Sequence, residues 1–125
     1  IVIDDSPDDA ELLRHDLAKI DGAHVVSFVV DESDPEHTID EAARVVRETL
    51  PSVATIDADL GPRAFGPDLA LRIPRGVYVV LVSGVTDEIL LRRLMRAAGA
   101  NGWPLASRRG TASTVMASAT ASCRT

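Results

Sequence analysis

The stretch VIDDSPDD (residues 2–9) leads from a short apolar strand directly into a helix. Ser6 is a typical N-cap, Pro7 suits the first helical position, and Asp9 lies where a capping box places an acidic residue. Acids in a first turn also favour the positive end of the helix dipole. Capping therefore accounts for the second half of the stretch. It does not account for Asp4, which still belongs to the strand, so a cation site is the alternative explanation for the acids.

The rest of the chain repeats this alternation of strand and helix. Apolar residues at helical spacing predict helices over residues 7–20, 39–50 and 86–98. Apolar, β-branched runs predict further strands at residues 24–30, 52–57 and 77–83, and a poorer one within 101–107. Between Pro67 and Pro74 only a short helix fits. For the last of the long helices, Thr86 is the expected N-cap and Gly99 the expected C-cap.

Apolar strands that alternate with helices predict a parallel sheet with helices on both faces, because each crossover helix packs against the sheet. Five such strands give a doubly wound α/β fold with strand order 2-1-3-4-5. In this order strands 1 and 3 are neighbours, and ligands bind beyond their carboxyl ends. Those ends carry Asp4, Asp5 and Asp57. We therefore expect three carboxylates to converge across one strand spacing of about 5 Å.

Carboxylates held this close repel one another, so a proton or a cation must compensate their charge. A site made only of oxygen ligands, with room for water, suits Mg²⁺, with Mn²⁺ as an alternative. With a metal offsetting the charge, Asp57 could act as a nucleophile that forms an acyl phosphate. Ser83, at the end of the fourth strand, could donate a hydrogen bond to a phosphoryl oxygen.

Composition limits the classes of function. The 125 residues fit a single domain (1–125), whose tail, 108–125, is expected to be either a weak last helix or a frayed end. With 13 Lys and Arg against 19 Asp and Glu, the net charge of −6 argues against direct nucleic-acid binding. Cys123 is the only cysteine, which excludes an internal disulfide. No apolar run approaches the roughly 20 residues of a membrane span. A cytoplasmic protein without membrane contact is expected.

Several motifs together resemble the receiver domains of two-component response regulators. VIDDSPDD resembles the acidic pair that ends the first strand of these domains. The other matching motifs are IDADLGP (56–62, the phosphoacceptor strand and loop), FGPDL (65–69, the start of the third helix), VVLVSG (79–84, the strand of the switch hydroxyl) and RAAGANGW (96–103, the entry to the last strand). The resemblance extends from Val2 to about Ser107.

This resemblance implies a flavodoxin-like fold and a signalling function that is not enzymatic. Asp57 would accept a phosphoryl group from a histidine kinase or a phosphotransfer protein. Ser83 and Trp103 would be the switch residues. Mg²⁺ would be held by the side chains of Asp4, Asp5 and Asp57 and by the backbone carbonyl of Asp59. The domain would then act on an output domain or a partner protein, with a homodimer as a further option.

One departure from the family pattern lies in the last strand. A lysine normally follows the aromatic residue by three positions, but Ala106 stands there, and Ser107 replaces the adjacent proline. Arg108 or Arg109 would have to reach back to replace that lysine. Because the lysine bonds the phosphoryl group in the switched state, its loss implies a weaker coupling between phosphorylation and conformation.

Two other functions remain open. The first is a pseudo-receiver that serves as a protein interaction module without phosphorylation. The second is an enzyme, because Asp57, Ala58 and Asp59 also resemble the first motif of haloacid-dehalogenase phosphatases, in which one aspartate is the nucleophile and the other an acid/base. That motif is expected on the first strand of a longer chain, whereas here it follows the third predicted strand.

Overall fold

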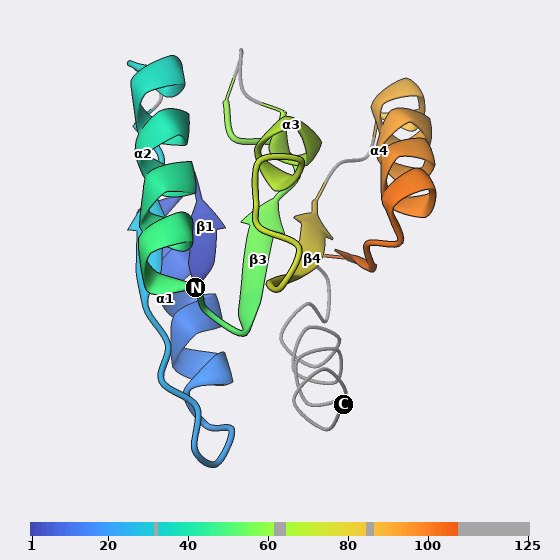
Figure 1. The fold of residues 1–125 in the computed structure, drawn as a ribbon. Helices are drawn as coiled ribbons and strands as arrows, with labels where there is room; N and C mark the ends of the chain where they lie inside the picture. Colours follow the sequence, from blue (N-terminus) through green and yellow to red (C-terminus); the bar gives the residue numbers. More distant parts are fainter. Residues whose placement is uncertain (32, 62–64, 85–86, 108–125) are drawn as a thin grey trace.

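The structure is a computed structural model that describes residues 1–31, 33–61, 65–84 and 87–107. These ranges form a five-stranded parallel sheet of order β2-β1-β3-β4-β5, which confirms the predicted topology (Figure 1). The strands are β1 (Val2–Asp4), β2 (Ser27–Val29), β3 (Val53–Asp57), β4 (Tyr78–Ser83) and β5 (Leu105–Ser107). The helices are α1 (Pro7–Leu17), α2 (Pro35–Thr49), α3 (Gly66–Ala70) and α4 (Glu88–Asn101).

Each face of the sheet carries its own apolar core. On one face, the buried residues of α1 pack against β1, β4 and β5; this cluster consists of Val2, Ala10, Leu13, Leu17, Val80, Val82 and Ala106. On the other face, α2, α3 and α4 pack against residues of β1, β3 and β4, among them Ile3, Ala54, Ile56 and Leu81. The prediction of helices on both faces is therefore confirmed. Because side chains alternate along a strand, Asp57 shares its face of β3 with Val53, which packs against the α1 cluster.

The second strand is shorter and more exposed than predicted. A continuous buried strand was expected over residues 24–30, but β2 spans only Ser27–Val29. Val26 is 47% exposed and Val29 40% exposed. The reason is the position of β2 at the edge of the sheet, where it pairs with β1 alone. An apolar run by itself cannot distinguish an edge strand from a central one.

The first helix begins as predicted and ends earlier. Ser6 has an extended backbone, and its side chain accepts a hydrogen bond from the Asp9 amide at 3.3 Å. The helix ends at Leu17 instead of Ile20. The amides of Lys19 and Ile20 bond to carbonyls three residues back, so the chain tightens into 3₁₀-type turns. Ile20 still packs against the α1 cluster, which explains why its spacing looked helical.

Leu50 was predicted on the buried face of the second helix but is 63% exposed. It is the C-cap of α2 and has a left-handed backbone with φ of 44°. Pro51 follows it, and a proline disfavours the helical conformation of the preceding residue. The helix therefore ends one residue before the apolar pattern does.

Both ends of the fourth helix differ from the prediction. Its N-cap is Asp87, whose carboxylate accepts the Leu90 amide at 2.9 Å, whereas Thr86 lies outside the described residues. The predicted C-cap, Gly99, lies inside the helix, which continues to Asn101 and ends at Gly102 with φ of 71°. Alanine on both sides of Gly99 is the strongest helix former and carries the helix past it.

The connection between β3 and β4 contains the predicted short helix. α3 spans only the five residues Gly66–Ala70. None of the helices in the described ranges has the length and apolarity needed to cross a bilayer. The tail predicted as a weak helix or frayed end, residues 108–125, lies outside the described part of the chain, as do Arg108 and Arg109.

Thr55, in the central strand β3, allows the cost of burying an unpaired hydroxyl to be measured. It is 2% exposed, and within the described part of the chain its hydroxyl has no hydrogen-bond partner. Replacing the hydroxyl by a methyl group of similar size removes a desolvated polar atom. We expect Thr55→Val to raise the free energy of unfolding by about 1 kcal/mol, measured by urea denaturation.

Thr38→Val is the matched comparison. Thr38 is also buried, but its hydroxyl donates to the Asp34 carbonyl at 2.9 Å. The same substitution should therefore lower the free energy of unfolding by about 1 kcal/mol. If the two substitutions change the free energy of unfolding by the same amount, burial of the Thr55 hydroxyl carries no free-energy cost.

Candidate metal centre

The pairing of β1 with β3 brings two acidic strand ends together. Val2 pairs with Thr55 and Ile3 with Ile56, so Asp4 and Asp57 follow in the next row of the sheet. Both strands are parallel and both end at these aspartates. Asp4 and Asp57 are 5% and 4% exposed. The fold itself, and not a local motif, therefore places the two carboxylates side by side.

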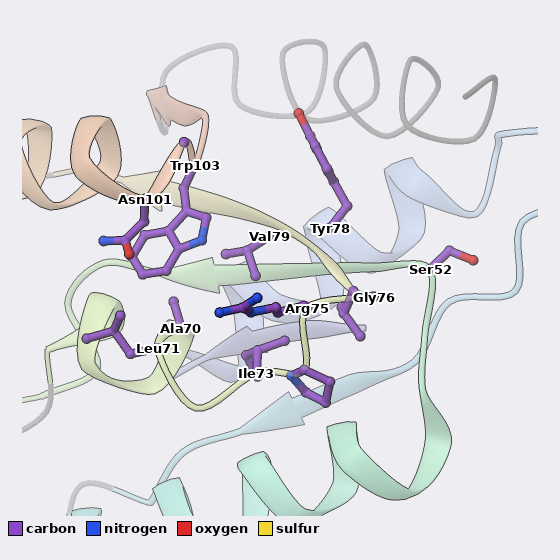
Figure 2. A pocket seen from close by; sticks show the side chains of 13 residues that line it. Ser52, Ala70, Leu71, Ile73, Arg75, Gly76, Tyr78, Val79, Asn101 and Trp103 are labelled. Atoms are coloured by element: carbon purple, nitrogen blue, oxygen red, sulfur yellow. The ribbon is translucent and has the colours of Figure 1, made fainter.

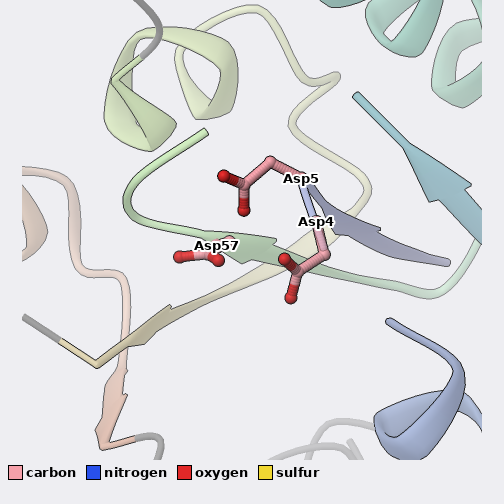
Figure 3. Close-up of side chains that lie close together, drawn as sticks. All are labelled: Asp4, Asp5 and Asp57. Carbon is pink, nitrogen blue, oxygen red and sulfur yellow. The ribbon is translucent and has the colours of Figure 1, made fainter. Parts of the chain in front are cut away.

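Asp5, the first residue after β1, lies close to the carboxylates of Asp4 and Asp57. One carboxylate oxygen each from Asp4, Asp5 and Asp57 lies within 4.8 Å of the others. Figure 3 shows the three side chains gathered at the ends of the two strands. Asp5 is only partly buried, so the group opens toward solvent on its side. The predicted convergence of these carboxylates is confirmed.

Backbone amides orient two of the three carboxylates. The Ser6 amide donates to Asp4 Oδ1 at 2.9 Å, and the Asp59 amide donates to Asp57 Oδ1 at 3.0 Å. Such amide dipoles offset part of the negative charge but not that of three neighbouring carboxylates. A set of oxygen donors with one partly open side matches the preference of Mg²⁺, which retains several waters. The residues present therefore fit a hard divalent cation.

The loop after β3 is fixed by backbone contacts. The Ala58 amide donates to the Val82 carbonyl at 2.8 Å, and the Gly66 amide donates to the Ala58 carbonyl at 2.9 Å. A Cβ atom on Gly66 would lie 2.3 Å from the Asp57 carbonyl oxygen and 2.8 Å from the Ala58 Cα. Only glycine permits this close approach. Gly66 thus helps to determine where the backbone of Asp57 lies.

Asp59 lies two residues after the end of β3 and Ser83 is the last residue of β4, and their surroundings differ. The Asp59 side chain is exposed, and its carboxylate accepts the Gly61 amide at 3.1 Å instead of joining the three clustered acids. The role of its backbone carbonyl remains a prediction. Ser83 is 7% exposed and ends β4. Because Asp57 pairs with Val82, Ser83 lies one residue beyond the level of Asp57.

Trp103 lies in another part of the domain. Leu81 pairs with Leu105, so Trp103 lies level with Val79, near the start of β4. It packs against the core of α2, α3 and α4 and lines a separate cavity. The structure therefore does not bring Trp103 to the carboxylates, and a switch role for it remains a prediction.

Ala106 lies in the same row of the sheet as the acids. Asp57 pairs with Val82, and Val82 pairs with Ala106, two strands from Asp57. Ala106 is 1% exposed and belongs to the α1 cluster. A long side chain here would extend from the face that carries Asp57, whereas the methyl group of alanine ends within the apolar core. Arg63 in the β3–α3 loop, a further cation near Asp57 in sequence, lies outside the described residues.

Comparison with solved structures identifies the fold. The signal receiver domain of a modulated diguanylate cyclase from Desulfovibrio desulfuricans G20 is 20% identical, with a TM-score of 0.73 over 98% of this chain and 90% of that one. A LuxR-family two-component response regulator from Aurantimonas sp. SI85-9A1 is 19% identical, with a TM-score of 0.69 over 91% and 76%. A two-component transcriptional regulator AraC from Clostridium phytofermentans ISDg is 17% identical, with a TM-score of 0.68 over 98% and 89%.

These structural neighbours are receiver domains or response regulators, and their likeness establishes a flavodoxin-like fold of the receiver type. No protein-family model and no curated protein matches the sequence. The fold is therefore shared with receiver domains at low sequence identity, and the chemistry must be argued from the side chains.

The close approach of Gly66 can be tested by adding one methyl group. Gly66→Ala should lower the free energy of unfolding by about 1 to 3 kcal/mol, because its Cβ meets backbone atoms that cannot rotate away. Gly99→Ala is the matched control, since nothing lies within 4 Å of a Cβ there and the residue is inside α4. That substitution should raise the free energy of unfolding by about 0.5 kcal/mol. If thermal denaturation shows that Gly66→Ala stabilises the protein as Gly99→Ala does, the close contact at Gly66 is contradicted.

Proposed function

We propose that this chain is a receiver domain of a two-component response regulator, which accepts a phosphoryl group on Asp57 from a histidine kinase or a phosphotransfer protein. The observation that carries the proposal is the convergence of Asp4, Asp5 and Asp57 within 4.8 Å at the junction of β1 and β3. In an open α/β sheet this junction is the place where ligands bind. The fold shared with receiver domains supports the same reading.

Mg²⁺, or Mn²⁺ in its place, is the proposed cofactor. The three clustered carboxylates and the backbone carbonyl of Asp59 would hold it. When bound, the metal supplies positive charge that offsets the negative charge of the transferring phosphoryl group. In the proposed reaction an oxygen of Asp57 attacks phosphorus, and the P–N bond to the histidine of the donor breaks. The electron pair leaves with the imidazole, which takes up a proton. The Ser83 hydroxyl would donate a hydrogen bond to the bound phosphoryl group.

The proposed partners are the phosphoryl donor on one side and an output domain or partner protein on the other, with a homodimer as a further arrangement. We place the domain in the cytoplasm and assign it no direct contact with nucleic acid or membrane. Phosphatase activity is not proposed, because the second aspartate of the phosphatase motif should face the first. The Asp59 carboxylate accepts the Gly61 amide instead.

A second candidate function is a phosphorylation-independent interaction module. It is favoured by Ala106, whose buried methyl group cannot contact a phosphoryl group two strands away. In that case the acidic cluster would bind a cation that stabilises the fold, without transfer of a phosphoryl group.

Metal binding has a measurable effect on stability. Adding MgCl₂ to metal-free protein should raise the free energy of unfolding by about 2.7 kcal/mol at about 100 times the dissociation constant. Asp5→Asn should abolish this response. Without metal, the same variant should be more stable than the unaltered chain by on the order of 1 kcal/mol, because one of three like charges is removed.

Asp8→Asn is the control for the metal experiment. Asp8 is an exposed residue in the first turn of α1 and does not belong to the carboxylate cluster. Its replacement should leave the response to MgCl₂ intact. Thermal unfolding that is insensitive to MgCl₂ and MnCl₂ in the unaltered chain would refute a cation site at these acids.

Phosphoryl transfer is tested with acetyl phosphate and MgCl₂, followed by mass spectrometry of the intact protein. We expect one added phosphoryl group on the unaltered chain and none on Asp57→Asn. Asp59→Asn should still be labelled, because its carboxylate lies outside the cluster. A chain that responds to MgCl₂ but is never labelled would support the interaction module over the phosphoacceptor.

A further inference from the structure

A cavity lies away from the acidic cluster, on the face of the sheet covered by α3 and α4. Its volume is about 860 Å³, within the range of small-molecule sites. It lies between the α3–β4 connection and the end of α4 (Figure 2). Its walls are formed by Ser52, residues 70 and 71, residues 73–79 and residues 101–103.

The short third helix explains why this cavity exists. At 1.5 Å per residue, the five residues of α3 cover about 7 Å, whereas the five residues of β3 extend over about 17 Å. The helix therefore covers only the part of the sheet close to the carboxyl ends of the strands. The remaining part is bordered by the connection to β4, and the end of α4 forms the opposite wall. The cavity is thus a consequence of the fold and not of a single side chain.

The lining combines buried apolar residues, which form its floor, with the polar residues Ser52, Arg75, Tyr78 and Asn101. Ala70, Ile73 and Val79 are 3%, 9% and 5% exposed and provide the floor. Arg75 and Asn101 lie in the exposed part of the lining. Among the described residues that line the cavity there is one arginine and no aspartate or glutamate, although the whole chain carries a net charge of −6. The described lining of the cavity therefore carries a positive charge, whereas the acidic cluster carries negative charges.

Trp103 supplies an aromatic wall whose position is fixed by the end of α4. Gly102 has the left-handed backbone that ends the helix, and the Trp103 amide donates to the Ala98 carbonyl at 2.9 Å. This is the hydrogen-bond pattern of a Schellman cap. The indole is only half-buried, so part of the ring faces the cavity. An aromatic ring held in this way offers a flat surface to a planar ligand.

Arg75 lies in the loop between α3 and β4. Its guanidinium extends from the loop toward the side of the cavity that carries Trp103 and Asn101 (Figure 2). Within the described ranges no salt bridge involves Arg75, whereas Arg72, three residues earlier, pairs with Asp40 at 2.6 Å. Arginine can bind a carboxylate through two parallel hydrogen bonds. Its position allows it to receive an anion.

We propose that this cavity binds a planar aromatic carboxylate, with the carboxylate on Arg75 and the ring against Trp103. One arginine matches one negative charge. The several phosphate charges of a nucleotide would meet a single cation on a domain that is itself acidic, so a monoanion fits better. The site is independent of the function proposed for the acidic cluster, because it shares none of the residues of that cluster.

The experiment uses 2-naphthoate as the probe and the indole N–H signal of Trp103, the only tryptophan, as the reporter in NMR titrations. We expect a saturable shift of this signal. Arg75→Gln should raise the dissociation constant about tenfold or more, the usual effect of losing a charge-assisted hydrogen bond. Arg75 is exposed, so its replacement removes no core packing. Arg72→Gln, which removes a neighbouring arginine outside the lining, should leave the dissociation constant unchanged.

Two further probes separate the alternatives. The neutral 2-naphthamide should bind about tenfold more weakly than 2-naphthoate, because it lacks the charge that Arg75 receives. Adenosine monophosphate should bind more weakly than 2-naphthoate. The proposal is overturned by the absence of a saturable shift, by equal affinity of the amide and the carboxylate, by an Arg75→Gln variant that binds as well as the unaltered chain, or by tighter binding of the nucleotide.

Discussion

The structure depends on the parallel pairing of β1 with β3. This pairing forms the centre of the sheet and aligns Asp4 with Asp57 in one row, with Asp5 beside them. In the observed register the apolar residues of both strands are buried on the two faces of the sheet, and the same register brings the like charges at the strand ends together. The stability of the core and the repulsion at its edge are therefore consequences of the same backbone arrangement, and a cation at this point would relieve the conflict.

Much of this arrangement could be predicted from the sequence, because the signals for the individual helices and strands are local and their order determines the topology. Ser6 and the residues after it follow the rules of helix capping, and the alternation of strands and helices determines a parallel sheet. The convergence of Asp5 and Asp57 follows from topology alone. The helical pattern is wrong at Leu50, because its apolar side chain continues a periodicity that Pro51 ends. Hydrophobic periodicity reflects the spacing of apolar side chains and contains no information on the backbone conformation that a following proline favours.

Other features could not be predicted because they depend on contacts between distant segments. In the sequence Gly66 is only one residue of the FGPDL motif, whereas the structure shows why glycine is needed there, namely the close approach to the backbone of Asp57. The cavity beside Trp103 arises from the difference in length between α3 and the strands it connects. Sequence indicated that the helix is short but gave no information on which side chains, Arg75 among them, would border the uncovered part of the sheet.

The edge position of β2 has a consequence for local opening. β2 has three residues and pairs with one strand only. Val26 just before it and Val29 within it are both exposed, so the strand loses few contacts when it opens. The strands that carry the clustered acids, by contrast, each have a neighbour on both sides. Amide hydrogens of β2 are therefore expected to exchange with solvent through small fluctuations, whereas those of β3 exchange only when much of the domain opens. The crowded carboxylates are thus attached to inner strands of the sheet, and the pairing of these strands keeps them together against their own repulsion.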